Sequence, residues 1–235
     1  MLVIVTGAAG RIGSAFVAGA AGAGFDLGFR PTDRDGDGVE RLDITDPEAC
    51  RAACRGVDAV LHLAADPDPN ADFRTSVLPV NVVGTYNMVE AALAEGVGRF
   101  VVASSAQAVD GHPPDHQVRE ADAPRPRNDY GAGKAFGEAL CSVAGLRGPT
   151  TFVSVRIGNY AEQRPGPEAT WRDRTAWLSP RDAVQLLGRA LTAPLDGVPG
   201  GHAVVHGVSD NASKRLSIAA TRRLLGYTPV DDAFA

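Results

Sequence analysis

The stretch MLVIVTGAAGRIG, residues 1–13, places an apolar run directly before three glycines. Its run LVIVT has no polar alternation, which is typical of a strand buried on both faces of a parallel sheet. Glycines in the turn after such a strand let a pyrophosphate approach the backbone at the positive end of the next helix. The alternative is a structural turn without a ligand. The stretch predicts a strand, a turn and a helix that bind a dinucleotide, and the expected contacts are Gly7, Gly10, Arg11, Ile12 and Gly13.

The rest of the chain alternates short apolar runs with longer amphipathic stretches. Strands are expected at 2–6, about 26–30, 57–64, 99–105, 150–157 and 202–208. Helices are expected at about 11–23, 46–54, 79–96, 129–145, 179–191 and 213–225. This alternation predicts an α/β fold with a Rossmann-type doubly wound parallel sheet. Residues 1–158 form the predicted dinucleotide-binding core, and 159–235 a small substrate-binding portion packed on it, which opens with a long loop at 159–177.

Composition narrows the class of protein. The 235 residues carry a formal net charge of -5 without a basic block, so no nucleic-acid partner is expected. No run approaches the roughly 20 apolar residues of a membrane span, and the N-terminus lacks the features of a signal peptide. Cys50 and Cys54 share a helix face but have no further ligands spaced to help, so no metal site is expected. We expect a cytoplasmic protein.

An acidic residue follows the second expected strand at the distance used for ribose recognition. Asp33 stands twenty residues after Gly13, where a carboxylate accepts hydrogen bonds from ribose hydroxyls and repels a 2′-phosphate. NAD is therefore favoured over NADP. Arg11, Arg30 and Arg34 keep NADP open, because each could turn towards a 2′-phosphate. Further along, Asp43 and Ile44 could close over the adenine edge; the alternative is a solvated acid beside a core isoleucine.

The segment YGAGKAFGE, residues 130–138, puts Tyr130 and Lys134 four positions apart. On a helix these two side chains lie on one face, although the same spacing also arises by chance. A free tyrosine, with a pKa near 10, is a poor base at neutral pH. A neighbouring ammonium favours the phenolate and lowers that pKa. Ser105 ends an expected strand, where a ligand binds in such sheets, and its hydroxyl could orient a substrate alcohol.

Five motifs together resemble the extended short-chain dehydrogenase/reductase superfamily, that is, the NAD-dependent epimerase/dehydratase family. They are TGAAGRIG, VLHLAA, NVVGTYNMVEAA, RFVVASSAQAV and YGAGKAFGEAL, in that order. The later segments VSVRIGNY, TAWLSPRDAVQLL and LLGYTPVDDA are similar to the uronate dehydrogenase-like branch. The resemblance implies that Tyr130 transfers the proton, that Lys134 binds the nicotinamide ribose and lowers the tyrosine pKa, and that Ser105 binds the reacting oxygen. It also implies a homodimer, and further cofactor contacts at Leu63, Ala64, Ala65, Asn81 and Ile157.

The expected substrate contacts depart from the uronate dehydrogenase pattern. Ala106 and Gln107 replace an Asn-His pair, and Asn159 replaces a serine. Arg172 matches the arginine that grips a uronate carboxylate; a solvent-facing loop arginine is the alternative. The resemblance implies an NAD(P)-dependent dehydrogenase that transfers hydride from a hydroxyl carbon of a small sugar, sugar acid or similar alcohol. Two alternatives stay open: an epimerase or dehydratase with tightly bound NAD, and a non-catalytic dinucleotide-binding sensor.

Overall fold

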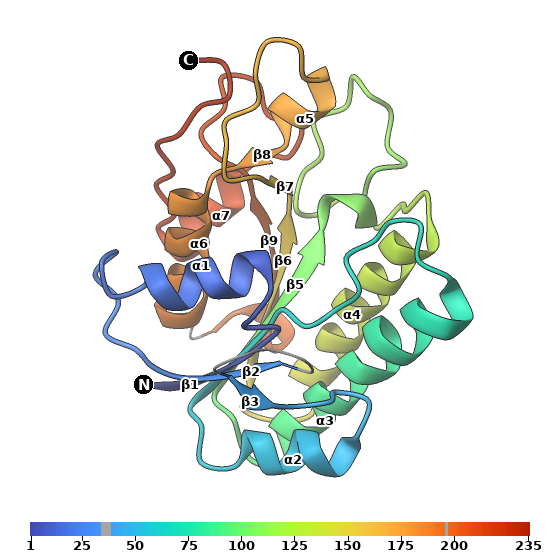
Figure 1. Ribbon diagram of the computed structural model, residues 1–235, viewed down its shortest axis with the longest axis vertical. Coiled ribbons are helices and arrows are strands. Elements are labelled where there is room, and N and C mark those ends of the chain that lie inside the picture. The colour runs from blue at the N-terminus through green and yellow to red at the C-terminus, as the bar shows by residue number, and fades with distance from the viewer. Residues whose placement is uncertain (34–38, 196) are drawn as a thin grey trace.

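The fold is built on a parallel sheet of seven strands, and the computed structural model describes residues 1–33, 39–195 and 197–235 (Figure 1). The strand order is β3-β2-β1-β4-β5-β6-β9. The strands are β1(Leu2–Thr6), β2(Gly28–Asp33), β3(Glu40–Arg41), β4(Ala59–His62), β5(Arg99–Ser105), β6(Thr151–Ile157) and β9(His202–Gly207). The order reverses between β1 and β4, which is where sheets of this kind bind ligands. The predicted α/β Rossmann-type fold is confirmed.

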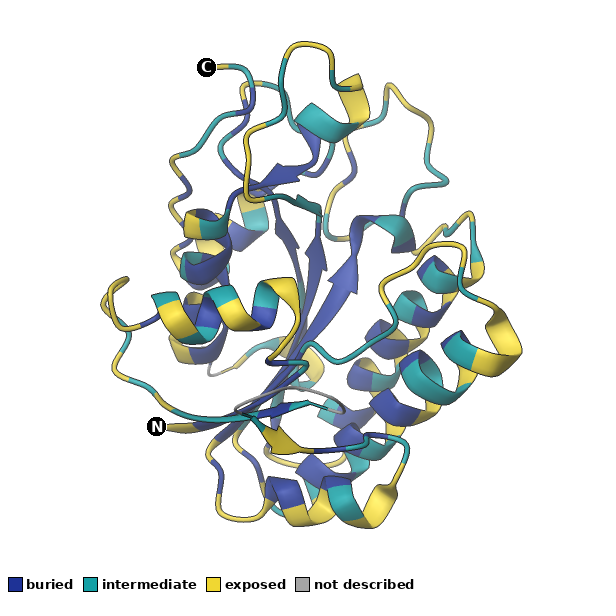
Figure 2. Ribbon diagram, in the orientation of Figure 1, coloured by how far each residue is buried: buried dark blue, intermediate teal, exposed yellow. Residues whose placement is uncertain are grey.

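Helices cover both faces of the sheet (Figure 1). On one face lie α1(Arg11–Gly19), α6(Pro180–Thr192) and α7(Ala219–Leu225). On the other face lie α2(Pro47–Cys54), α3(Thr85–Ala94) and α4(Asp129–Gly145). Side chains of successive strand residues point to opposite faces, so Val3 and Val5 enter one core and Ile4 enters the other. This is why β1 shows no polar alternation, and why Figure 2 shows buried strands between helices with exposed outer faces.

Several element boundaries differ from the sequence prediction. The strand expected at 26–30 is β2, which runs to Asp33. The helix expected from 79 begins earlier, as the π-helical segment η1(Phe73–Gly84), and continues directly into α3. The Asp72 side chain sets the new start by accepting a hydrogen bond from the Thr75 amide at 2.9 Å. Pro79, the first residue of the expected helix, lies inside η1.

The expected final helix at 213–225 is shorter, because its first residues are extended. Val118 donates its backbone amide to the Arg215 carbonyl and accepts from the Ser217 amide. This pairing with a distant segment replaces the first turns of the expected helix. The helix that remains is α7, which begins at Ala219. The chain also forms short 3₁₀ segments, η2(Ala106–Ala108) and η3(Pro199–Gly201).

The segment expected as a long loop at 159–177 has structure of its own. It contains β7(Asn159–Tyr160), α5(Trp171–Thr175) and β8(Trp177–Leu178), and β7 pairs in parallel with β8. Thr170 caps α5 by accepting from the Asp173 amide at 3.1 Å. The expected cap of the next helix is confirmed, since Ser179 accepts from the Asp182 amide and Pro180 occupies the first position. Within the described ranges, no helix combines the length and apolar character that crossing a membrane requires.

Candidate active site

A cavity of about 720 Å³ opens at the carboxyl ends of β1, β4, β5 and β6. It lies at the point where the strand order reverses. Most of the predicted site residues line it: Gly7, Gly10, Arg11, Ile12, Gly13, Asp33, Asp43, Ile44, Leu63, Ala64, Ala65, Ser105, Ala106, Gln107, Tyr130, Lys134, Ile157 and Asn159. Residues separated by more than a hundred positions thus share one cavity, because every parallel strand delivers its carboxyl end to the same edge.

The backbone of the glycine turn is too closely packed for side chains at Gly7 and Gly13. Gly7 has a φ of +69°, and a Cβ on it would lie 2.7 Å from the Ala64 nitrogen. A Cβ on Gly13 would lie 2.3 Å from the Gly7 carbonyl oxygen. No side chain of the described residues caps α1, and its first turn has no acidic residue. The exposed start of α1 therefore offers backbone amides and a positive dipole end to a pyrophosphate.

Asp33 lies at the edge of the cavity beside this turn. One of its carboxylate oxygens accepts a hydrogen bond from the Ala9 amide at 3.0 Å, which fixes the side chain next to the glycines. Arg30 is held away by Glu40 in a two-point ion pair, with both distances 2.8 Å. Arg11 stays in the cavity, where it donates to the Tyr160 carbonyl at 3.2 Å. Arg34, the third candidate for a 2′-phosphate, lies outside the described residues.

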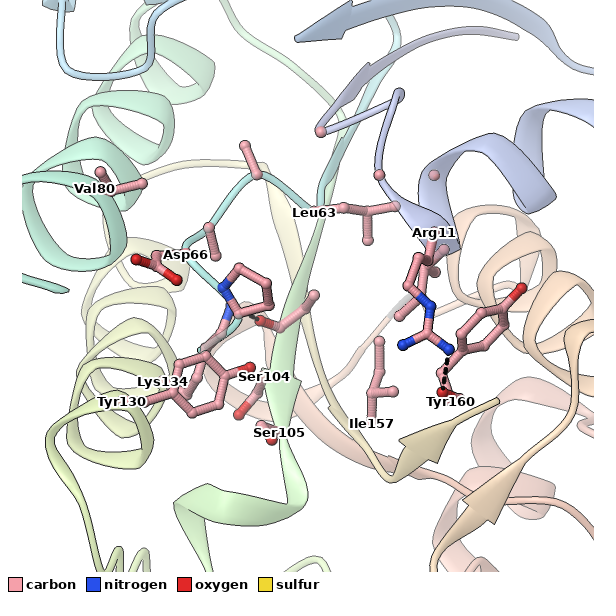
Figure 3. Close-up of a pocket in the computed structure, with 18 of the residues that line it drawn as sticks. Arg11, Leu63, Asp66, Val80, Ser104, Ser105, Tyr130, Lys134, Ile157 and Tyr160 are labelled. Carbon is pink, nitrogen blue, oxygen red and sulfur yellow. Dashed lines mark hydrogen bonds between the residues drawn. The ribbon is translucent and has the colours of Figure 1, made fainter. Parts of the chain in front are cut away.

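The catalytic candidates come from two neighbouring elements (Figure 3). Ser105 ends β5, whereas Tyr130 and Lys134 lie on one face of α4. Lys134 donates to the Ala103 carbonyl at 2.9 Å, and its ammonium lies 5.6 Å from the centre of the Tyr130 ring. The three side chains therefore meet at one wall of the cavity.

Burial governs the electrostatics of this wall. It raises the pKa of Tyr130; a hydrogen bond with Ser105 opposes the rise, and the charge of Asp66 adds to it. Burial also lowers the pKa of Lys134 to about 8. A phenol with a raised pKa needs a nearby positive charge before it can act as a base near neutral pH. That Lys134 supplies this charge stays a prediction.

A buried network behind this wall holds α4 against the sheet. Glu138, one helical turn after Lys134, pairs with Arg156 on β6 through two hydrogen bonds of 2.9 and 2.8 Å. Ser104 on β5 donates to the same carboxylate at 2.5 Å. The side chains of Arg156 and Glu138 are only 2% and 5% exposed. The network ties α4, β5 and β6 together, so it fixes the helix face that carries Tyr130 and Lys134 relative to Ser105.

Two predicted site residues are not brought into the cavity. Asn81 is buried beneath it, where its side chain accepts from the Asp66 amide at 2.8 Å and donates to the Asp66 carbonyl at 3.0 Å. Arg172 is paired with Asp110, with its Nη2 at 2.8 Å from a carboxylate oxygen, and lines a separate, smaller hollow. Asn159 does line the cavity, but its side-chain amide donates to Asp173 at 2.8 Å.

Sequence reasoning missed polar groups of the cavity, among them Asp66 and Ser76. Tyr160, which was expected to line a wall of the pocket or to pack under the loop, lines the cavity beside Arg11. Asp66 could have been found, because it follows the expected strand at 57–64 by two residues. Nothing in the sequence pointed to Ser76 as a residue of the cavity, because the helix that carries it was expected to begin only at residue 79.

Comparison with known proteins identifies the class. Residues 3–171 match the NAD dependent epimerase/dehydratase family. The chain belongs to this family, and NAD is its cofactor, as the sequence predicted.

Relatives with nearly the same length are sugar dehydrogenases by name. An NAD-dependent glucose-6-phosphate dehydrogenase of Haloferax volcanii is 37% identical, over 98% of this chain and 94% of its own. An L-arabinose 1-dehydrogenase (NAD(P)(+)) of the same organism is 36% identical, over 98% of this chain and 97% of its own. Among solved structures, a mutant uronate dehydrogenase from Agrobacterium tumefaciens complexed with NAD is 28% identical, with a TM-score of 0.84 over 99% of this chain and 86% of its own. The prediction of an NAD(P)-dependent dehydrogenase related to the uronate dehydrogenases is confirmed.

Proposed function

We propose that the protein oxidises a hydroxyl carbon of a small sugar or sugar acid, with Tyr130 as the base. The observation that supports this most strongly is that Ser105, Tyr130 and Lys134 form one wall of the cavity that also contains the glycine turn. The names of the relatives support a sugar as the substrate, because they act on glucose 6-phosphate, L-arabinose and uronates. The ring hydroxyl at C1 is the one that we expect to react.

Each catalytic residue has one task in this proposal. Ser105 hydrogen-bonds the reacting hydroxyl and holds it towards Tyr130. The Tyr130 phenolate takes the proton of the C1 hydroxyl. The C1 carbon loses its hydrogen as hydride, together with the bonding electron pair, so that the C1–OH group becomes the carbonyl of a lactone. NAD, when bound, supplies the acceptor for that hydride. Lys134 lies 5.6 Å from the ring centre, and its charge favours the phenolate.

The proposal extends to cofactor contacts and to the division of the chain. We assign the pyrophosphate to Gly7, Gly10 and Gly13, and the adenosine ribose to Asp33. The portion 159–235 supplies Asn159 and Tyr160 to the cavity wall and the last strand to the sheet, which supports a substrate-binding role for a segment that packs on the core. A cytoplasmic location is part of the proposal, because all three thiols are free and buried, as expected in a reducing compartment.

We also propose a homodimer. Large apolar side chains are exposed on the helical layer formed by η1, α3 and α4; they are Phe73, Leu78, Val83, Tyr86, Phe136 and Val143. Large apolar side chains exposed on one helical layer indicate an interaction surface, and a second copy would cover it symmetrically. Val143→Glu should shift the mass in solution from dimer to monomer, measured by light scattering. A monomeric parent protein would contradict this part.

The experiment that tests the function measures NADH against product for a panel of aldoses and uronic acids. A dehydrogenase gives one NADH for each lactone formed. An epimerase or dehydratase with retained NAD gives an altered sugar without net NADH. A sensor binds NAD and turns over none of the panel. The proposal requires the first result and is refuted by either of the others.

A further inference from the structure

Asp66 places a carboxylate at the same end of the cavity as the catalytic candidates. It lies in the loop after β4, and Figure 3 shows it on the same side of the cavity as Tyr130 and Lys134, across from Arg11 and Tyr160. Its negative charge adds to the rise in the pKa of the Tyr130 phenol, although burial is the larger cause.

The position of Asp66 is fixed by its surroundings. The buried Asn81 side chain bonds both its amide and its carbonyl, at 2.8 and 3.0 Å. One carboxylate oxygen accepts from the Asp68 amide at 2.9 Å, and the other accepts from the Ser76 hydroxyl. A carboxylate has about four acceptor positions, so two stay available to a ligand.

No cation of the described residues forms an ion pair with Asp66. Among the residues that the structure describes, the charged ones that line the cavity are Arg11, Asp33, Asp43, Asp66 and Lys134. Arg11 lies at the far end, and Lys134 donates to the Ala103 carbonyl. Arg172, which sequence similarity suggests for a substrate carboxylate, is instead held by Asp110 outside this cavity. Within the described ranges, the substrate end therefore has the Asp66 carboxylate beside the Lys134 ammonium, which donates to the Ala103 carbonyl, and no guanidinium to receive an anion.

We infer that Asp66 determines substrate charge: it accepts a hydrogen bond from a hydroxyl of an uncharged sugar and disfavours substrates with a carboxylate near the reacting carbon. This inference rests on the proposed sugar oxidation and makes it more specific. A carboxylate held against a second carboxylate is repelled, whereas a sugar hydroxyl gains a charge-assisted hydrogen bond.

The test compares matched pairs that differ only at C6: glucose with glucuronate and galactose with galacturonate. In the parent protein, kcat/KM should favour the uncharged member by about tenfold or more, equivalent to about 1.4 kcal/mol. Asp66→Asn keeps the shape and can still bond both Asp68 and Ser76, but it removes the charge. It should shift the ratio towards the uronate, mainly through KM.

Two further measurements separate a charge effect from a structural one. Ser76→Ala removes the hydrogen bond but leaves the charge, so it should keep the parent ratio. Asp66→Asn should also move the rising limb of the rate–pH profile to lower pH, because the phenol loses a neighbouring negative charge, whereas Ser76→Ala should not. Inhibition constants of the two members of each pair, measured against a sugar that the parent protein oxidises, should show the same preference for the uncharged member without the use of a variant.

The outcomes of these measurements distinguish the two proposals. A preference for the uronate, or a ratio unchanged in Asp66→Asn, would overturn the role of Asp66 and leave the sugar dehydrogenase intact. NADH from no member of either pair, and from none of the wider panel, would overturn both.

Discussion

Glu138→Leu should destabilise the protein strongly, because it leaves the buried positive charge of Arg156 without its carboxylate partner. The Glu138 carboxylate receives two hydrogen bonds from Arg156 and one from Ser104, and both ionic side chains are at most 5% exposed. Without it, the bond from the guanidinium to the Asp122 carbonyl at 3.2 Å is the one that remains among the described residues. Breaking such a pair from one side costs about 3–5 kcal/mol. In a chain of this size, each kcal/mol lowers the unfolding temperature by about 2–4 °C, so the expected fall is roughly 6–20 °C.

The assay is urea unfolding with the free energy taken by linear extrapolation. The matched control is Glu90→Leu, which removes the partner of Arg147 in a surface ion pair. The side chains of Arg147 and Glu90 are 49% and 30% exposed. That change should leave the free energy of unfolding nearly unchanged, because an exposed ion pair contributes little to stability. The double variant Glu138→Leu/Arg156→Met should recover most of the loss, because neither charge then remains buried. A loss below about 1 kcal/mol for Glu138→Leu alone would refute the reasoning.

Other consequences concern the glycine turn and a buried histidine. Gly13→Ala places a Cβ 2.3 Å from the Gly7 oxygen, so it should weaken NAD binding by about tenfold or more, measured by calorimetry. The control Gly22→Ala should leave NAD binding unchanged, because the atom nearest to its Cβ is 3.6 Å away. Equal affinities of the two variants for NAD would show that the turn tolerates the methyl group. His62, between Thr6 and Thr85, has its pKa lowered to about 3 by burial and by the charge of Lys134. Because the unfolded chain binds this proton at an ordinary pKa near 6.5, stability should fall as pH drops from about 6.5 towards 3, by about 3–5 kcal/mol in full. Urea unfolding of the parent and of His62→Gln should show this slope in the parent only; parallel curves would contradict the assignment.

Local patterns were sufficient to predict the parts of the site that depend on neighbours in the chain. The glycine turn, Asp33 and the Tyr130–Lys134 pair each occupy a fixed spacing within or just beyond one element, so their positions follow from strand and helix geometry. The carboxyl ends of the strands then bring them together in one cavity.

The positions that local patterns did not foresee depend on contacts between distant segments. Arg172 could be matched by similarity, but its pairing with Asp110, sixty-two positions away, has no local signal. Asn81 was expected at the cofactor, yet it supports the loop of Asp66 from below. The final helix was overestimated because Val118 pairs with residues 215–217, which helical periodicity cannot reveal.

The most direct test of the account is the rate of NADH formation by Tyr130→Phe with a sugar that the parent oxidises. Removing the phenol oxygen should lower kcat by about a hundredfold or more, while the dissociation constant of NAD stays within about threefold of the parent value. Tyr160→Phe, on the opposite side of the cavity, should keep kcat within about tenfold of the parent. A Tyr130→Phe protein that forms NADH at nearly the parent rate would contradict the assignment of the phenol as the base.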